Sequence, residues 1–486
     1  MNVLLLKHEL TLILLGVGVL LADLWLPAER KRNLGCLAAA GVGAILICSF
    51  LTPLPAEPQF AFGRMFVLDG MALFFKRFFL VATILVLLMA AEYSDRIAAG
   101  ISEYYSLILF AAAGMMFAAS ANDFALLFVA LELITVTFYV LVSFQRGRST
   151  SLEAGVKYLI IGALSSAFMV FGIAFMYGTS GAFNFGDIAA KLAEPGANLA
   201  GNKLFLCGLL FLFVGLGFKI SAVPFQIWAP DVYQGAPTPT TAFLAVGSKA
   251  AGFVLLLRVL FVAVPDVTAH WWKLLVVISA LTILYGNLCA LPQTNLKRLL
   301  GYSSISHAGY LLLGVAAASA AGQSAVLYYL GGYLFTVLAA FLVIALVLRE
   351  TGAEDIEALA GLNQRSPLLA AALTFSMVSL AGIPPLAGFF GKFLLIKSAL
   401  LAGAAHPAFY WLVAVALAGV VMSLAYYFGV VRAIYWGRAG RNLSELPMSL
   451  PAKTMVLVCM AGILFIGIYP SPLLRAAEAA VLALKG

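Results

Sequence analysis

Long apolar runs alternate with short polar turns along almost the whole chain. A helix needs about 20 predominantly apolar residues to cross a bilayer, and about fourteen runs reach that length. They lie near residues 9–27, 33–52, 71–92, 102–119, 122–144, 153–177, 203–228, 238–262, 270–290, 298–317, 325–349, 367–402, 408–436 and 453–473. The pattern predicts an all-α polytopic membrane protein, with residues 1–486 forming a single membrane domain.

Composition supports this prediction. Of the 486 residues, 63% are hydrophobic and 10% are charged, and the mean hydropathy is +1.05, far from the values of soluble domains. The net charge of +8 lies mainly in short loops, where Lys and Arg orient membrane helices, so we expect no nucleic-acid partner. Five cysteines are scattered singly without a C-x-x-C pair. We therefore expect neither a metal site nor a bound cofactor in this chain.

The basic residues also predict an orientation. With the N-terminus outside, about twelve Lys and Arg fall in the inner loops and about six in the outer loops. Because cytoplasmic loops carry the excess of positive charge, the turns with Arg32, Arg146 and Arg365 should face the cytoplasm. Both termini and the loop near Glu194 should face outside.

The stretch from Gly215 to Lys249 combines two lysines with a helix-breaking proline. A charged group near the middle of a bilayer costs about 2.5 to 3.5 kcal/mol on insertion scales, so Lys219 and Lys249 must face protein or water. Pro224 lacks an N–H and crowds a preceding carbonyl, which predicts a break in the seventh span after Lys219. Broken helices occur at membrane depth only inside protein or beside a wet cavity, which is the setting of an ion path.

The twelfth span has the same character. Lys392 follows Pro384, Pro385 and three glycines, which predicts a second broken helix. Interrupted spans in the two halves of a chain hint at an internal repeat with a site at the breaks. Lysine precedes proline in one span and follows it in the other, so the sequence alone does not align the two.

Glu132 lies in the fifth span with about ten mostly apolar residues on each side. Either it forms a structural ion pair with Lys219, or it controls the protonation of a proton-carrying Lys219. We favour the second interpretation, because desolvation offsets the attraction in a buried ion pair and leaves little net stability. Lys249 and Lys392, expected at similar depth, extend Lys219 into a row of groups that exchange protons.

Two residues are secondary candidates for this relay. Lys157 lies four residues after Glu153, so a structural i, i+4 ion pair explains it nearly as well. His307 lies among hydroxyl residues in GYSSISHAGY and exchanges protons near neutral pH, although a simple interhelical hydrogen bond explains it equally well. Lys297 and Lys397 lie near span ends, where we expect their side chains to extend to the membrane surface.

Several motifs together resemble one family. GLGFKISAVPFQIWAPDVYQGAPTP, SKAAGF, QTNLKRLLGYSSISHAGY, DIEALAGL and SLAGIPPLAGFFGKF are similar to subunit N of the proton-pumping NADH:quinone oxidoreductase, complex I. The resemblance covers about residues 104–435. Multi-subunit cation/proton antiporters share the architecture, but PDVYQGAP and LLGYSSISH resemble subunit N.

The resemblance implies about fourteen helices, with helices 7 and 12 broken and two inverted five-helix repeats. The repeats would occupy residues 102–262 and 270–436. Three N-terminal helices at 1–95 would precede them, and a C-terminal helix at 453–486 would follow them.

The same resemblance implies proton translocation. Quinone reduction by NADH elsewhere in the complex would drive protons through one channel in this chain, which itself has no redox centre. Matched onto this sequence, the relay positions of the family are Glu132, Lys219, Lys249 and Lys392, with Lys157 and His307 as secondary positions. After Val-Pro-Phe, where the family usually has histidine, this chain has Gln226. Glutamine orders water but does not carry a proton, so that position cannot pass protons in the same way.

Partners also follow from the resemblance. FMN, iron–sulfur clusters and quinone would be bound by partner subunits, and other complex I membrane subunits, including neighbouring antiporter-like subunits, would flank this chain. The chain would be a multi-pass protein of the bacterial inner (plasma) membrane.

Two other functions remain open from the residues, and a third is disfavoured. A subunit of a stand-alone cation/proton antiporter would copurify without a quinone reductase. A solitary transporter with lysines that meet an anionic substrate would function as a single chain. A purely structural membrane scaffold does not explain four charged residues inside apolar spans.

Overall fold

Nearly all of the chain is helical, as the apolar runs predict. The computed structural model describes residues 3–55, 57–194, 199–437 and 445–484, and thirteen helices among them are long and apolar enough to cross a membrane. The twelfth expected span, 367–402, is divided into two shorter helices, α16 (Pro367–Ala381) and α17 (Ala387–Ala402). With this pair counted as one span, thirteen plus one gives the fourteen that the sequence predicts.

Eleven of the spans are single continuous helices. They are α1 (Lys7–Asp23), α2 (Lys31–Leu51), α3 (Gly70–Glu92), α4 (Ile101–Ala119), α5 (Phe124–Val142), α6 (Ser149–Ser180), α12 (Pro265–Ala290), α13 (Leu296–Ala316), α14 (Ala320–Thr351), α18 (Ala408–Trp436) and α19 (Leu450–Ile468).

The seventh and eighth spans are irregular. The seventh consists of α8 (Lys203–Ile220) and α9 (Trp228–Gly235), and the predicted break separates them. The eighth consists of α10 (Thr238–Phe243) and α11 (Lys249–Arg258), each followed by a π-helical segment, Leu244–Ser248 and Val259–Ala263. Such π-helical turns are rare and are frequent at functional sites.

Polar side chains begin many of the helices where the apolar runs start. The side chains of Asp69, Asp123, Asn202, Asn295 and Ser319 each accept a hydrogen bond from a backbone N–H in the first turn of the helix that follows. These caps satisfy donors that have no partner within the helix.

The short elements lie between the spans or after them. They are the two-stranded antiparallel hairpin of β1 (Gln59–Ala61) and β2 (Phe66–Leu68), α7 (Phe185–Ala193), α15 (Leu362–Arg365) and the C-terminal α20 (Ser471–Leu482). The hairpin is not predicted by the apolar pattern. The expected single C-terminal helix at 453–486 is wrong, because α19 ends before Tyr469 and α20 begins after Pro470. The segment between α14 and α16 contains a 3₁₀ turn, Ile356–Leu359, and α15. Gly352 and Gly361, both with φ +73°, separate these pieces with left-handed backbone that ends a helix.

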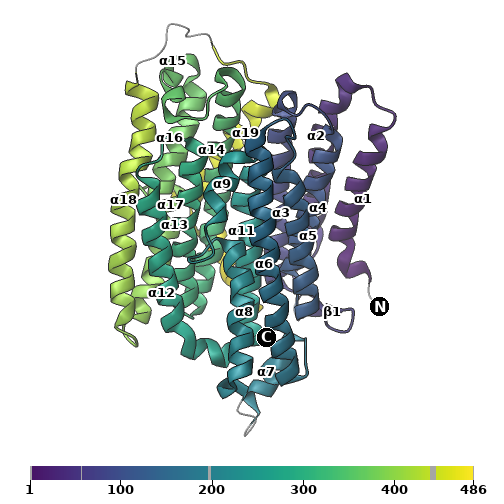
Figure 1. Ribbon diagram of the computed structural model, residues 1–486, viewed down its shortest axis with the longest axis vertical. Coiled ribbons are helices and arrows are strands. Elements are labelled where there is room, and N and C mark those ends of the chain that lie inside the picture. The colour runs from purple at the N-terminus through teal and green to yellow at the C-terminus, as the bar shows by residue number, and fades with distance from the viewer. Residues whose placement is uncertain (1–2, 56, 195–198, 438–444, 485–486) are drawn as a thin grey trace.

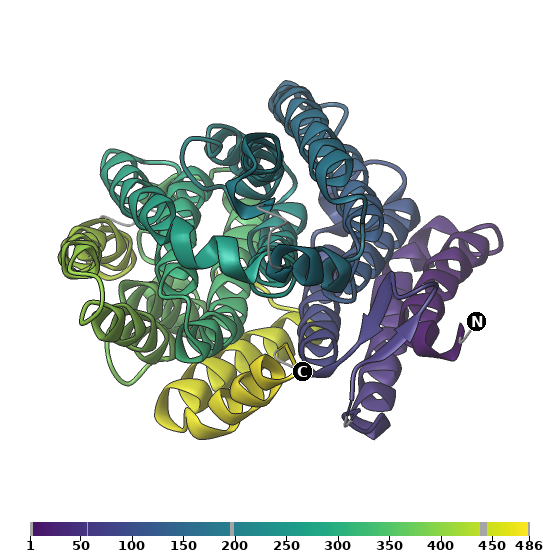
Figure 2. The same cartoon turned by 90° about the horizontal axis from the view of Figure 1, so that it is seen from below.

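Both termini lie at the same end of the bundle, together with β1 and α7, whereas α15 lies at the opposite end (Figure 1). This arrangement agrees with the predicted grouping of loops, while which end faces the cytoplasm stays a prediction. Arg438 and Arg441, two of the inner-loop basic residues counted for the predicted orientation, lie outside the described residues. Viewed along the helices, the N-terminal helices stand at one edge of an elongated bundle and α18 at the other (Figure 2).

The centre of the bundle is formed by α13, α14 and the eighth span. In the most apolar segment of each, 100%, 94% and 89% of the residues are buried. The helices α12 and α13 touch backbone to backbone at two glycines. A Cβ on Gly309 would lie 2.7 Å from the backbone nitrogen of Ile283, and one on Gly286 would meet the backbone nitrogen of Ser306. Close approach of this kind holds α13, which carries His307, in a fixed position against α12.

Candidate functional site

The first break places a lysine at the end of a half-helix. The helix α8 ends at Ile220, and Ser221 adopts left-handed backbone at φ +60° before Pro224. The indole of Trp228 donates to the carbonyl of Phe218 at 3.1 Å, so one carbonyl freed by the break has a partner. Lys219 thus lies in the last turn of α8, as the sequence predicts.

Lys219 is buried beside Glu132 without forming an ion pair. Its side chain is 2% exposed, and its Nζ donates to the hydroxyl of Thr135 on α5 at 3.0 Å. Glu132 lies one turn earlier on α5, is half-buried, and accepts a hydrogen bond from Ser166 on α6 at 2.5 Å. No ion pair within 4.0 Å joins Glu132 and Lys219 in the part of the chain that the structure describes.

A small cavity lies between these two charged groups. Glu132, Thr135, Ser166 and Lys219 all line it. The cavity has a volume of about 10 Å³, close to what a single water molecule needs. The geometry therefore allows a carboxylate and a lysine to communicate through a hydroxyl group or one water molecule.

The helix α11, which begins at Lys249, packs against the stem of Lys219 at a glycine. A Cβ on Gly252, one turn after Lys249, would lie 3.2 Å from the Cγ atom of Lys219. Lys249 is 1% exposed and follows directly after the π-helical segment of the eighth span. Its Nζ donates to the backbone carbonyl of Ser304 on α13.

His307 lies one turn beyond Ser304 on α13. It is almost fully buried, and its two ring nitrogens are hydrogen-bonded to the phenols of Tyr329 and Tyr427, on α14 and α18. Lys249 and Lys392 both lie within electrostatic range of the imidazole. The structure thus brings His307 near two of the predicted lysines.

The second break holds Lys392. The helix α16 ends at Ala381, Gly382 adopts φ +88°, and α17 begins at Ala387 after the two prolines. Lys392 is 4% exposed and donates to the carbonyls of Leu380 and Ala381 at 2.7 and 3.2 Å. These carbonyls have no partner within α16 because the helix ends there. The ammonium also lies 4.9 Å from the ring centroid of Tyr310, within the range of a cation–π contact.

The other buried cations differ from these three lysines, because each of them faces a carboxylate. The pairs are Lys76 with Glu9 at 2.7 Å, Arg258 with Asp69 at 2.8 Å, and Lys297 with Glu354 at 3.3 Å. Lys219, Lys249 and Lys392 donate only to neutral oxygen atoms among the described residues.

For Lys297, the expectation of an extended surface side chain is wrong. Its side chain is 0% exposed and also donates to the carbonyl of Ala236 at 2.8 Å. The buried partners come from elsewhere in the chain, and the local sequence gives no sign of them. Lys397 is exposed, and the extension of its side chain to the membrane surface stays a prediction.

Lys157 is half-exposed and forms two ion pairs. It lies 2.8 Å from Glu153, the predicted i, i+4 partner, and 2.7 Å from Asp231 on α9. Asp231 also lies 2.5 Å from Arg298 at the start of α13. The sequence reasoning missed Asp231, although its position within the PDVYQGAP motif marked it for attention.

Gln226 lies buried within the first break, and its Oε1 atom has no hydrogen-bond partner among the described residues. The same holds for the hydroxyls of Ser221, Tyr139 and Tyr158. Buried polar atoms are almost always hydrogen-bonded to protein or water. The surroundings of Lys219 are therefore suited to ordered water.

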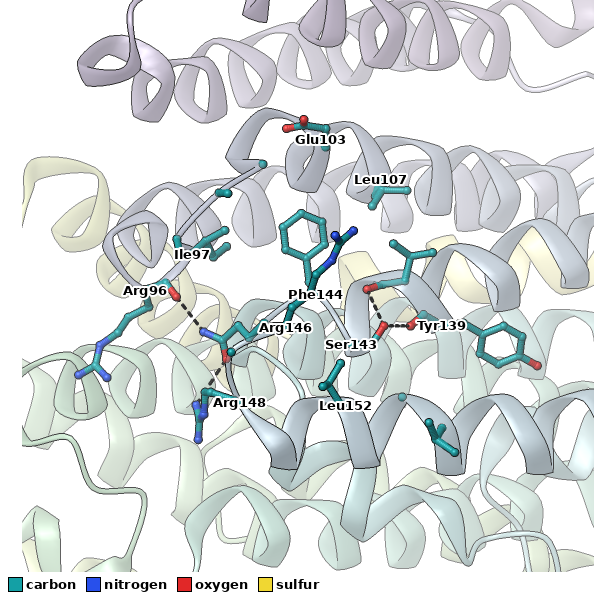
Figure 3. Close-up of a pocket in the computed structure, with 18 of the residues that line it drawn as sticks. Arg96, Ile97, Glu103, Leu107, Tyr139, Ser143, Phe144, Arg146, Arg148 and Leu152 are labelled. Carbon is teal, nitrogen blue, oxygen red and sulfur yellow. Dashed lines mark hydrogen bonds between the residues drawn. The ribbon is translucent and has the colours of Figure 1, made fainter.

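A larger hollow of about 1240 Å³ opens at the end of the bundle where α5 meets α6 (Figure 3). Arg96, Glu103, Phe144, Arg146 and Leu152 are among the residues that line it. None of the predicted relay residues lines this hollow. Elsewhere, no group of three or more His, Cys, Asp or Glu among the described residues is placed to hold a metal ion.

Comparisons with known proteins agree with this architecture. Residues 121–423 match the family described as NADH:quinone oxidoreductase/Mrp antiporter, transmembrane. NADH-quinone oxidoreductase subunit N of Moorella thermoacetica is 40% identical over 475 residues, 97% of each chain. The subunit of the same name from Rhodospirillum rubrum is 38% identical, with 98% of this chain and 96% of the relative covered.

Solved structures give the same result. A chain of respiratory complex I from Thermus thermophilus with bound aureothin aligns with a TM-score of 0.79 at 34% identity, covering 97% of this chain and 99% of the other. A chain of the Mrp complex from Dietzia sp. DQ12-45-1b aligns with a TM-score of 0.81 at 22% identity, covering 99% and 100%, and so shares the fold. The chain therefore belongs to the subunit N family of NADH:quinone oxidoreductase, the antiporter-like membrane subunits of respiratory complex I.

Proposed function

We propose that this chain carries protons across the membrane along Glu132, Lys219, Lys249 and Lys392, with His307 between the last two lysines. The observation that supports the proposal is the contrast among the buried cations. Among the described residues, the other buried lysines and arginine face a carboxylate, whereas these three lysines donate only to neutral oxygens. A buried lysine without a counter-ion exchanges its proton readily, because burial disfavours the charged form and no fixed negative charge opposes that effect.

In this proposal Glu132 is the switch for Lys219. When the carboxylate is ionised and close, it stabilises the protonated lysine, and when it moves away or is neutralised, the lysine releases its proton toward Lys249. The shared cavity and the stem contact of Lys219 with Gly252 are the geometric basis for these two steps. Lys157, which is paired with Glu153 and Asp231, would be a secondary member of the relay.

The energy for this transfer would come from quinone reduction by NADH in partner subunits, which would hold the FMN, the iron–sulfur clusters and the quinone. Other complex I membrane subunits, including antiporter-like neighbours, would flank this chain in the bacterial plasma membrane. The two broken helices would occupy equivalent places in inverted repeats at 102–262 and 270–436, between N-terminal helices at 1–95 and a C-terminal region at 453–486.

A second candidate is a subunit of a multi-subunit cation/proton antiporter. The fold shared with the Mrp complex chain favours it, because the same lysine row would serve an exchanger. Purification of the native complex separates the two. Flavin and iron–sulfur signals that copurify with this chain support the oxidoreductase, and their absence from a stable native complex would support the antiporter.

The relay itself is tested with two lysines of α17. Lys392→Ala in the reconstituted complex should abolish NADH-driven proton uptake, while Lys397→Ala, an exposed lysine on the same helix, should leave uptake near that of the parent. Assembly is checked on native gels. Normal uptake by an assembled Lys392→Ala complex would contradict the proposal.

The proposed orientation is tested with single cysteines. Cysteines placed at positions 32, 146 and 365 should resist a membrane-impermeant thiol reagent added from outside, and one placed at 194 should react. Labelling of position 146 from outside would reverse the topology.

A further inference from the structure

His307 has an unusual pair of neighbours. The hydroxyl of Tyr329 is hydrogen-bonded to Nδ1, and the hydroxyl of Tyr427 is hydrogen-bonded to Nε2 at 3.0 Å. The three side chains come from α13, α14 and α18, and all are nearly fully buried. A neutral imidazole has one donor nitrogen and one acceptor nitrogen. One phenol therefore donates to the ring while the other accepts from it. The two hydrogen bonds then point the same way through the three side chains, which sets a direction for proton transfer.

The two phenols lie on different sides of the imidazole. The ring of Tyr329 occupies the space where Gly391, the residue before Lys392, would carry a Cβ. The hydroxyl of Tyr427 is also hydrogen-bonded to the hydroxyl of Ser303. The next residue, Ser304, offers its carbonyl to Lys249. Hydrogen bonds thus connect Ser303, Tyr427, His307 and Tyr329 in a chain. One end of this chain lies beside the residue that binds Lys249, and the other end contacts the residue before Lys392.

The other aromatic hydroxyls nearby are used differently. Tyr328, adjacent to Tyr329, donates to the backbone carbonyl of Ile466 at 2.8 Å. Tyr426, adjacent to Tyr427, donates to the side-chain oxygen of Asn287 at 2.9 Å. Two tyrosine pairs therefore each contain one residue that binds His307 and one that fixes a helix contact.

We propose that Tyr427 and Tyr329 carry the proton into and out of His307, so that phenol hydroxyls connect Lys249 to Lys392. This inference rests on the proposed relay function. The Lys249 ammonium gives up a proton that reaches the oxygen of Tyr427, and the hydroxyl proton already on Tyr427 passes to Nε2. The proton on Nδ1 then passes to the oxygen of Tyr329, whose own hydroxyl proton leaves for the neutral amine of Lys392. No phenolate or lasting imidazolium is needed, and rotation of the hydroxyls with the return of the imidazole tautomer resets the chain.

The other groups that face His307 are neutral or shared with the relay. The rings of Tyr310 and Tyr333 lie 6.1 and 5.3 Å from the imidazole, centroid to centroid. Among the described residues, Lys249 and Lys392 are the charged groups that act electrostatically on the imidazole. Transfer through a neutral ring adds no third positive charge beside the two lysines.

The test uses the two tyrosine pairs in the assembled complex. Tyr329→Phe and Tyr427→Phe should each lower NADH-driven proton uptake about tenfold or more, since positioned proton-transfer groups contribute at least that much to rates. The solvent deuterium isotope effect on uptake should rise, because proton transfer then limits the rate. Tyr328→Phe and Tyr426→Phe remove one buried hydroxyl each from the same helices and should leave uptake within about twofold of the parent.

The outcomes separate this inference from the relay itself. If Lys392→Ala stops uptake while assembled Tyr329→Phe and Tyr427→Phe complexes pump normally, the relay stands and the phenols take no part. If Lys392→Ala also pumps normally, the relay fails as well. Equal losses in all four tyrosine variants would overturn the inference, because loss of any buried hydroxyl would then account for the defect.

Discussion

Thr135 offers a way to change Lys219 without removing it. Its hydroxyl is the hydrogen-bond acceptor that the described residues provide for the lysine ammonium, at 3.0 Å. Valine has nearly the same shape as threonine and no hydroxyl, so Thr135→Val removes this interaction and little else. A hydrogen bond to a charged group contributes about 1.5 to 3 kcal/mol. Since 1.4 kcal/mol is tenfold in an equilibrium constant, Lys219 should bind its proton about 10 to 100 times more weakly.

The sign of the effect follows from which form is stabilised. The hydroxyl favours the protonated lysine, so without it the lysine is protonated only at lower pH. The alkaline limb of the pH profile of proton uptake should therefore move about one to two pH units toward acid.

The assay measures initial rates of NADH-driven proton uptake in proteoliposomes between pH 6 and 9, relative to NADH oxidation with a soluble acceptor. Thr137→Val is the matched control, because Thr135 and Thr137 both donate to the carbonyl four residues earlier at 2.6 Å. The reasoning is refuted if the Thr135→Val and parent profiles superimpose. An equal shift in Thr137→Val would refute it as well.

Three further predictions concern the same path and its support. Lys219→Ala should abolish uptake, and Lys219→Arg should also fail because arginine holds its proton. Glu132→Gln should impair uptake, whereas Glu132→Asp should keep part of it. Normal uptake by an assembled Lys219→Ala complex would exclude the switch. Gln226→Leu should slow uptake and Gln226→His should leave it near normal, as measured in the same vesicles, and full activity of the leucine variant would show that water ordering at this position is unimportant. Arg258→Ala leaves the buried carboxylate of Asp69 without its partner and should destabilise the fold by about 3 to 5 kcal/mol. The loss should be seen as less assembled complex on native gels. Undiminished assembly would mean that the ion pair is not structural.

The sequence predicts the spans and the breaks well because both depend on local chemistry. Apolar length sets the helices, and Pro224 and the pair at Pro384 and Pro385 disrupt them wherever they occur. The lysines near these breaks are conspicuous for the same reason, since a charge in an apolar run needs an explanation. The sequence could not predict the hairpin of β1 and β2, because three-residue strands carry almost no periodic signal.

The partners of the site residues depend on contacts between distant segments. Tyr427 lies 120 residues from His307, and Thr135 lies 84 residues from Lys219. Serine, threonine and tyrosine are also unremarkable in an apolar helix, so composition does not single them out. The same limit explains the error at Lys297, whose carboxylate partner, Glu354, lies 57 residues away.

The backbone contact between α12 and α13 restricts how energy can reach this path. A displacement of α13 along its axis would carry side chains into the space that Gly286 and Gly309 leave open, and close-packed interiors resist such overlap. We therefore expect α13 to stay in place during the pumping cycle while charges and water molecules move around it. A driving signal would then cross this subunit as a changing electric field, in which each lysine responds to the protonation of the lysine before it. Structures captured at different stages of the cycle should differ in the side-chain rotamers and hydration at α13, with little change in the backbone of this helix.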